Sequence, residues 1–252
     1  MVEGANVLHE ALASDVPVES LYVDCSHVVP GDRSDLAIRE AHRRGARVYD
    51  LAPGVIERVA ATVTPQPVLA VVPCRDVPLS SLRNADLLLI CVDLRDPGNA
   101  GTVLRSAQAA GASGVLCCDG SVDVFNPKTV RASAGALFRV PVVAGGDAVE
   151  VLEEVGRWGL CRLATAARGG TDYATVDLAR PVALVLGNEA HGLPADLAPV
   201  LDGVVTIPMA GDADSLNVGM AAAVLCFEAA RQRRAAGTPA TGIGAPVRVG
   251  QP

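Results

Sequence analysis

Three polar loops hold the residue types that can do chemistry, and each of them follows an apolar run. The first extends from Asp93 to Arg105 and contains an Asn-x-Gly-x-x-x-Arg pattern. Asn99 stands where we expect a helix to begin, so its side chain is predicted to cap that helix, while Gly101 lets another backbone come close. Arg105, about one and a half turns further along, is predicted to lie near the same helix end. Taken alone, a capped helix with a solvated arginine explains this loop equally well.

The second loop, Leu186-Gly187-Asn188-Glu189-Ala190-His191-Gly192-Leu193, places a carboxylate between two glycines directly after an apolar run. This pattern predicts a tight loop whose backbone groups face a ligand. The sequence contains neither G-x-G-x-x-G nor G-x-x-x-x-G-K-[ST], so nothing supports dinucleotide or triphosphate binding. His191 is of the type that can act as a base, but a lone loop histidine is more often simply exposed.

The third loop joins Ile207-Pro208-Met209 to Ser215-Leu216-Asn217-Val218-Gly219 through the small and acidic residues Gly211-Asp212-Ala213-Asp214. A strand that ends in proline thus meets Ser and Asn at the start of an expected helix. The simplest interpretation makes Ser215 an ordinary N-cap.

The elements that must position these loops alternate between strands and helices. Residues 87–92, 114–118, 182–186 and 204–207 are apolar runs typical of buried parallel strands, and 101–110 and 216–232 are predicted helices. This order predicts a parallel α/β sheet with its ligands at the carboxyl ends of the strands.

The first part of the chain predicts a separate, small α/β unit. Its expected helices are 4–12 and 36–44, and its expected strands are 21–24, 47–50 and 68–72. We therefore divide the chain into a domain at 1–78, a linker at 79–85, a second domain at 86–235 and a disordered tail at 236–252.

Composition excludes several classes of protein. The chain has 252 residues, is 50% hydrophobic and contains no apolar run long enough to cross a bilayer, so disorder of most of the chain and a membrane span are excluded. Its net charge of −7 excludes a general positive field, so any nucleic-acid site must be local. Seven cysteines without a C-x-x-C pair, and scattered histidines, predict a reduced cytoplasmic protein without a metal site. The N-terminus also lacks the features of a signal peptide.

Together, and in this order, the motifs resemble those of the SpoU/TrmH family of RNA ribose 2′-O-methyltransferases, within the SPOUT superfamily. The resemblance rests on N-x-G-x-x-x-R, on L-G-N-E-x-x-G-L, on I-P-M followed by S-L-N-V, and on the segment 133–141, which matches S-x-G-A-x-F-x-x-P. Val2-Glu3-Gly4 before an amphipathic helix is similar to the start of the family's ribosomal-protein-like substrate-binding domain. Relatives usually carry a basic segment ahead of it, so we expect this domain to be truncated at its N-terminal end.

The resemblance implies a parallel α/β domain with a deep C-terminal trefoil knot, which binds S-adenosylmethionine, plus a small α/β N-terminal domain. The reaction centre that it implies consists of Asn99, Arg105, Glu189, Ser215 and Asn217. The implied cofactor-binding residues are Leu186, Gly187, Glu189, Gly192, Ile207, Pro208, Met209, Leu216 and Asn217. Because the pKa of arginine exceeds about 12, we expect Arg105 to hold a phosphate and orient the hydroxyl rather than act as a base. Many relatives have Ser where this chain has Gly219, yet we still expect activity.

The expected partners are RNA and a second copy of the chain, and not DNA or a membrane. Two arginine groups are candidate RNA contacts, although a solvated helix face is the usual alternative: Arg39, Arg43, Arg44 and Arg47 in the first domain, and Arg131 and Arg139 in the second. With few aromatic residues, shape and phosphate contacts are expected to dominate over extensive base stacking. We predict 23S rRNA as the substrate. The alternatives are a tRNA ribose methyltransferase, or a non-catalytic RNA-binding or ribosome-assembly protein that retains the fold.

Overall fold

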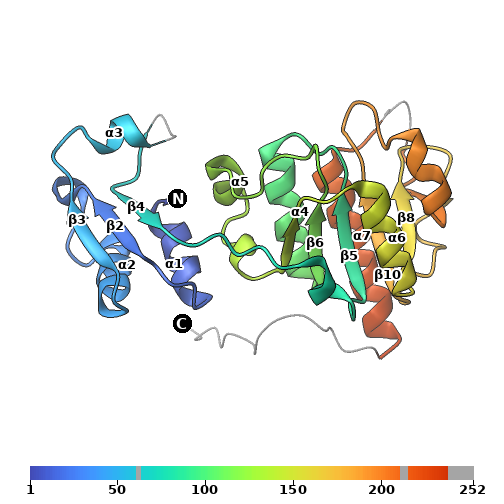
Figure 1. Cartoon of the computed structure of the whole chain (residues 1–252), viewed down its shortest axis with the longest axis horizontal. Coiled ribbons are helices and arrows are strands. Elements are labelled where there is room, and N and C mark those ends of the chain that lie inside the picture. Colours follow the sequence, from blue (N-terminus) through green and yellow to red (C-terminus); the bar gives the residue numbers. More distant parts are fainter. Residues whose placement is uncertain (61–63, 211–214, 238–252) are drawn as a thin grey trace.

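The computed structural model describes residues 1–60, 64–210 and 215–237, and it contains two separate sheets, each with its own helices (Figure 1). The smaller sheet has the strand order β1-β4-β2-β3. Strands β2 and β3 are parallel, and β4 runs antiparallel to both β1 and β2. Its elements are β1 (Val2–Glu3), α1 (Ala5–Ala13), β2 (Ser20–Val23), α2 (Arg33–Arg43), β3 (Arg47–Asp50), α3 (Ile56–Val59) and β4 (Val68–Val71).

The larger sheet is parallel throughout, in the order β7-β6-β5-β10-β8-β11-β9. Its strands are β5 (Leu87–Cys91), β6 (Gly114–Cys117), β7 (Val142–Ala144), β8 (Cys161–Thr165), β9 (Thr171–Asp172), β10 (Val182–Leu186) and β11 (Gly203–Thr206). Its helices are α4 (Pro97–Ala110), α5 (Pro127–Ala132), α6 (Ala148–Arg157) and α7 (Val218–Ala235). Short 3-10 turns occupy Cys25–His27, Leu79–Leu82, Ala136–Phe138 and Ala195–Val200. The predicted parallel α/β sheet is therefore confirmed.

Both faces of the larger sheet are covered, which explains why its central strands are apolar at every position. Strands β5 and β10 are fully buried. Leu87 and Leu89 of β5 pack in one cluster with α4 and α7, whereas Leu88 and Ile90 pack in a second cluster with α6. The site loops therefore start from a rigid, closely packed layer.

Two glycines allow the helices beside the site to pack closely. A Cβ atom on Gly101 would lie 2.4 Å from the Cβ of Ala132 in α5, so the prediction that another backbone approaches here is confirmed. A Cβ atom on Gly219 would lie 2.9 Å from Thr102 of α4. Helices α4 and α7 are thus held against each other through small residues.

Both predicted helix caps were wrong. Helix α4 begins at Pro97, and Asp96 caps it by accepting the backbone N–H of Asn99 at 2.7 Å. Asp followed by Pro at the first helical position is a favourable start, and it leaves the side chain of Asn99 free for other contacts. Helix α7 begins at Val218, and its cap is Asn217 rather than Ser215.

The two sheet units meet through polar contacts as well as apolar ones. Glu10 of α1 accepts a hydrogen bond from Arg139 at 2.5 Å, and both side chains are half-buried. Arg131 of α5 lies 4.0 Å from the carboxylate of Glu3.

None of the helices in the described ranges is both long enough and apolar enough to cross a membrane. Residues 238–252 of the predicted tail lie outside the described residues, as do residues 211–214 of the third loop.

Candidate active site

A cavity of about 710 Å³ opens at the carboxyl ends of β8, β10 and β11, where the sheet topology predicts a ligand. Of the predicted site residues, the following line it: Gly187, Glu189, Gly192, Ile207, Met209, Ser215, Leu216 and Asn217. Leu186 is fully buried in β10, and its carbonyl oxygen accepts the backbone N–H of Val92. Leu186 and Pro208 do not line the cavity, so their predicted contact with the cofactor stays a prediction.

Three of the predicted reaction-centre residues form a chain of hydrogen bonds at the mouth of this cavity. The side-chain amide of Asn217 donates to the side-chain oxygen of Asn99 at 2.9 Å. The amide of Asn99 in turn donates to the carboxylate of Glu189 at 2.6 Å. These residues come from positions 99, 189 and 217, far apart in the sequence, and the structure brings them together as the resemblance implied.

The direction of this chain is fixed by the start of helix α7. The side-chain oxygen of Asn217 accepts the backbone N–H groups of Gly219 and Met220, so its amide nitrogen must face Asn99. The oxygen of Asn99 is then engaged, and its nitrogen is aimed at Glu189. Because the cap orients Asn217, it also orients both other side chains.

A second tie, between the first and second loops, was missed by the sequence analysis. The side-chain amide of Asn188 donates to the carbonyl oxygen of Asp93 at 3.0 Å and to its carboxylate at 3.2 Å. The side-chain oxygen of Asn188 accepts the backbone N–H of Ala190 at 2.9 Å. Asp93 has a φ of 52°, which is unusual for a residue with a side chain. The sequence contains no pattern that would reveal this tie, because it joins residues 95 positions apart.

The glycines of the second loop line the cavity, and they also allow the loop to fold closely against its own backbone. A Cβ atom on Gly187 would lie 2.6 Å from the backbone of Gly192. Asn188 and Gly192 exchange backbone hydrogen bonds, at 3.0 and 2.9 Å, so the loop turns back on itself at once. Gly187 is therefore required by the neighbouring backbone, before any ligand is considered.

Arg105 lies apart from this hydrogen-bonded chain. Its side chain is exposed, does not line the cavity and bonds to no other residue in the described part of the chain. An unpaired guanidinium is free to hold a phosphate in a bidentate contact. Ser215 is exposed at the cavity and His191 is exposed in the second loop, and no hydrogen bond of either side chain is seen among the described residues.

The cavity suits a ligand with a flat aromatic ring and a positive charge. Its walls include Leu193, Ile207, Met209 and Leu216, and Glu189 is the one charged side chain among the described residues that line it. Its volume falls within the range of about 300–1,000 Å³ that small-molecule sites occupy. These features fit S-adenosylmethionine, which carries an adenine ring and a sulfonium cation.

The cysteines take no part in this site. Burial raises the pKa of both Cys118 and Cys226 to about 12, so these thiols stay protonated at neutral pH. Cys91 is fully buried and its pKa is raised, chiefly by the hydrogen bond with Cys117. In the described ranges, no three His, Cys, Asp or Glu residues are grouped so that they could hold a metal ion.

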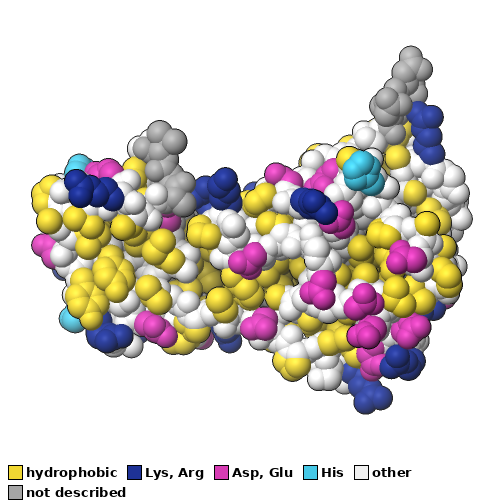
Figure 2. All heavy atoms as spheres, turned by 45° about the horizontal axis from the view of Figure 1, so that its top comes forward, with side chains coloured by type: hydrophobic (Ala, Val, Ile, Leu, Met, Phe, Trp, Pro, Cys, Tyr) yellow, Lys and Arg dark blue, Asp and Glu magenta, His cyan; other side chains and the backbone are white. Residues whose placement is uncertain are grey.

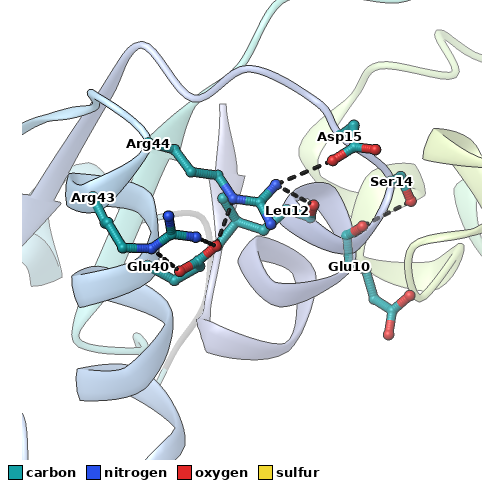
Figure 3. A network of polar contacts seen from close by, with 7 residues as sticks. All are labelled: Glu10, Leu12, Ser14, Asp15, Glu40, Arg43 and Arg44. Atoms are coloured by element: carbon teal, nitrogen blue, oxygen red, sulfur yellow. Dashed lines mark hydrogen bonds and ion pairs between the residues drawn. The ribbon is translucent and has the colours of Figure 1, made fainter.

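The predicted RNA-binding arginines of the first unit are mostly paired with acids (Figure 3). Glu40 accepts hydrogen bonds from Arg43 and Arg44, which lower its pKa to about 2, and Arg44 also bonds to Asp15 and to the carbonyl oxygen of Leu12. Arg39 pairs with Asp35 in the same helix. Arg47 alone among the four has no side-chain partner in the described part of the chain. Figure 2 likewise shows basic side chains in scattered groups rather than a continuous basic face.

Each of the two sheet units matches a known protein family. Residues 86–227 match the SpoU rRNA Methylase family, and residues 1–75 match a family described as RNA 2′-O ribose methyltransferase substrate binding. A 23S rRNA (guanosine(2553)-2′-O)-methyltransferase of Bacillus subtilis is 34% identical, over 90% of this chain and 86% of its own length.

Two solved structures are similar over nearly the whole chain. The SpoU methyltransferase AviRb from Streptomyces viridochromogenes has a TM-score of 0.80 and 31% identity, over 94% of this chain and 90% of its own. An rRNA methyltransferase from Sinorhizobium meliloti with bound AdoMet has a TM-score of 0.74 and 32% identity, over 91% of this chain and 85% of its own. This chain therefore belongs to the SpoU rRNA methylase family and is an S-adenosylmethionine-dependent RNA 2′-O-methyltransferase.

Proposed function

We propose that this protein methylates the 2′-hydroxyl of one ribose in 23S rRNA, with Asn99, Arg105, Glu189, Ser215 and Asn217 around the reacting hydroxyl. The observation that carries this proposal is the hydrogen-bonded chain from Asn217 through Asn99 to Glu189 beside the cavity. A retained fold without catalysis would give no reason to keep three polar side chains oriented toward one another at this place. The rRNA target is supported by the relatives that match along both sheet units.

The reaction needs a neutral hydroxyl to be oriented and relieved of its proton. S-adenosylmethionine supplies an electrophilic methyl group on a sulfonium. Glu189, as an acceptor at the cavity mouth, is placed to receive a hydrogen bond from the ribose, and Asn99 holds its carboxylate in one position. Arg105 is free to hold a neighbouring phosphate and so to fix the ribose. The walls at Ile207, Met209 and Leu216 are placed to hold the adenine ring.

The proposed C-terminal knot is supported by the order of the strands. Strand β10 lies between β5 and β8, although the chain passes through β8 first. After β11 the chain returns to α7, which packs against α4 next to β5. The loop after β10 and the chain before α7 then share the edge that holds the cavity.

The proposed homodimer is supported by an apolar face of helix α7. Met220 and Phe227 are 54% and 49% exposed, and seven positions apart they share one side of the helix. We propose that a second copy covers this side and completes the site. Because the substrate is rRNA, the protein is proposed to act in the cytoplasm. Arg47, Arg131 and Arg139 remain proposed RNA contacts, with Arg139 also joined to Glu10.

The experiment is methyl transfer from labelled S-adenosylmethionine to separated pools of 23S rRNA and tRNA that lack their natural 2′-O-methyl groups. The proposal predicts label in 23S rRNA. Label in tRNA alone would replace the rRNA target with a tRNA target. If neither pool takes up label while the protein still binds the cofactor in a calorimeter, the catalytic proposal fails and a non-catalytic role takes its place.

A further inference from the structure

The smaller sheet carries a pair of stacked tyrosines on the face opposite to helices α1 and α2. The rings of Tyr22 and Tyr49 have centroids 5.3 Å apart and planes inclined by 18°. They lie opposite each other in the register of β2 and β3. Leu21 and Val23 of β2 point to the other face, where they are buried in a cluster that includes residues of α1 and α2. The tyrosine pair therefore stands on the opposite face of this sheet.

The outer ring of this stack faces the solvent. Strand β3 is the last strand of the sheet in the described part of the chain, and all four of its residues are exposed. Tyr49 is 43% exposed even though Tyr22 covers one face of its ring. Because the rings are nearly parallel and Tyr49 comes from the edge strand, the second face of its ring is turned outward. Figure 2 shows apolar side chains gathered over this part of the molecule.

An unpaired cation lies next to this ring. Arg47 precedes Tyr49 by two positions in β3, so alternation places both side chains on the same face, roughly 6.6 Å apart along the strand. The side chain of Arg47 is exposed and has no partner among the described residues, in contrast to Arg39, Arg43 and Arg44. A free ring face beside a free guanidinium matches one nucleotide, whose base stacks while its phosphate is bound.

We propose that Tyr49, backed by Tyr22 and flanked by Arg47, is a stacking platform for an unpaired base of the RNA substrate. The platform rests on the proposed function, because it assigns the substrate a single-stranded segment at the first sheet unit. A base that continues the stack of Tyr22 and Tyr49 gains dispersion contact without ordering a flexible side chain. Recognition is then sequence-tolerant, because every base has a ring face. One such platform adds to the affinity from phosphate and shape contacts, which remain the main source of RNA binding.

The test measures binding of the full chain to a fluorescent single-stranded oligoadenylate and to an RNA duplex, by anisotropy at several salt concentrations. Tyr49→Ala is expected to weaken binding to the single strand by roughly 5- to 150-fold. Tyr49→Phe is expected to bind as the original chain does, because the ring does the stacking. Arg47→Gln is expected to reduce the slope of log affinity against log salt by about 1. Val48→Thr, on the other face of the same strand, is the matched control and is expected to change nothing.

Three outcomes would overturn the platform: an unchanged affinity of Tyr49→Ala, an equal loss in Val48→Thr, or a change of oligomeric state without a change of RNA affinity. The last outcome would make the face a protein interface. Methylation of 23S rRNA by the unmodified chain is measured in parallel. If that reaction proceeds while Tyr49→Ala binds RNA as the original chain does, only the platform fails. If the platform variants behave as expected while no RNA is methylated, only the proposed function fails.

Discussion

Replacing Asn99 by aspartate tests the hydrogen-bonded chain with the smallest change of shape. Asn99→Asp keeps the side-chain volume but replaces the amide that donates to Glu189 at 2.6 Å with a second carboxylate. The helix should tolerate the change, because position 99 lies in the first turn of α4, where a negative charge is favourable. The variant therefore separates the orientation of Glu189 from the folding of the domain.

The expected magnitude follows from the lost hydrogen bond. A hydrogen bond to a charged group contributes about 1.5–3 kcal/mol, and the exposure of Glu189 reduces this to about 1–2 kcal/mol. If the reaction needs the held carboxylate, kcat/KM falls about 5- to 30-fold near neutral pH. Two adjacent carboxylates also raise the pKa of one of them, so the pair takes up a proton as the pH falls. A shared proton restores a hydrogen bond, so the ratio of original to variant activity should shrink as the pH falls below neutral.

The assay is steady-state methyl transfer to 23S rRNA at several pH values, with calorimetric titration of the cofactor alongside. Asn126→Asp is the matched control, since Asn126 caps α5, and the substitution adds the same charge at another helix start. Full kcat/KM in Asn99→Asp, or a defect that is independent of pH, would refute a role of Asn99 in holding Glu189. An equal defect in Asn126→Asp would assign the effect to charge alone.

Three further predictions concern neighbouring parts of the molecule. Arg105→Ala should lower turnover in the methyl-transfer assay at least about 100-fold and leave the cofactor Kd from calorimetry unchanged, because Arg105 lies outside the cavity. Loss of both turnover and cofactor binding would contradict its role toward RNA. Gly219→Ser should lower the free energy of unfolding by about 1–2 kcal/mol in urea titrations, since its Cβ meets Thr102 at 2.9 Å, and Thr102→Ala should restore part of that loss. The hydrogen bond with Arg231 lowers the pKa of Glu228 from its ordinary 4.5 to about 2. The ionised carboxylate therefore stabilises the fold above pH 4.5, and this contribution is lost as the pH falls toward 2. Glu228→Gln should flatten the urea-unfolding profile in that window, and an unchanged profile would show that this ion pair does not matter.

Most of the catalytic unit was predictable because its strands are buried on both faces. Continuous apolar runs such as 87–92 and 182–186 are typical of strands at the centre of a parallel sheet. In such a sheet the loops that follow the strands lie at one edge, so the positions of the polar loops could be predicted as well. The strand at 142–144 and the elements from 148 to 172 were not predicted. In that part, partly exposed strands such as β8 mix polar with apolar residues and lack the continuous apolar run.

The residues that make up the site could be predicted from the sequence, but the hydrogen bonds between them could not. The motifs indicated that Asn99, Glu189 and Asn217 act together, yet only the fold shows which atom donates to which. Helix caps were misjudged because Asn, Asp and Ser are all good caps, and local sequence does not decide among near neighbours. The stacked tyrosines depend on the pairing of β2 with β3, which no local pattern reveals.

The central claim is that this chain places a methyl group on a ribose 2′-oxygen of 23S rRNA. The most direct measurement is nucleoside mass spectrometry of 23S rRNA treated with the protein and S-adenosylmethionine, with the same rRNA treated with the protein but without S-adenosylmethionine as the blank. One new 2′-O-methyl nucleoside is expected, absent from the blank and resistant to alkaline cleavage on its 3′ side. A methylated base, or an rRNA identical to the blank while the cofactor is bound, would contradict it.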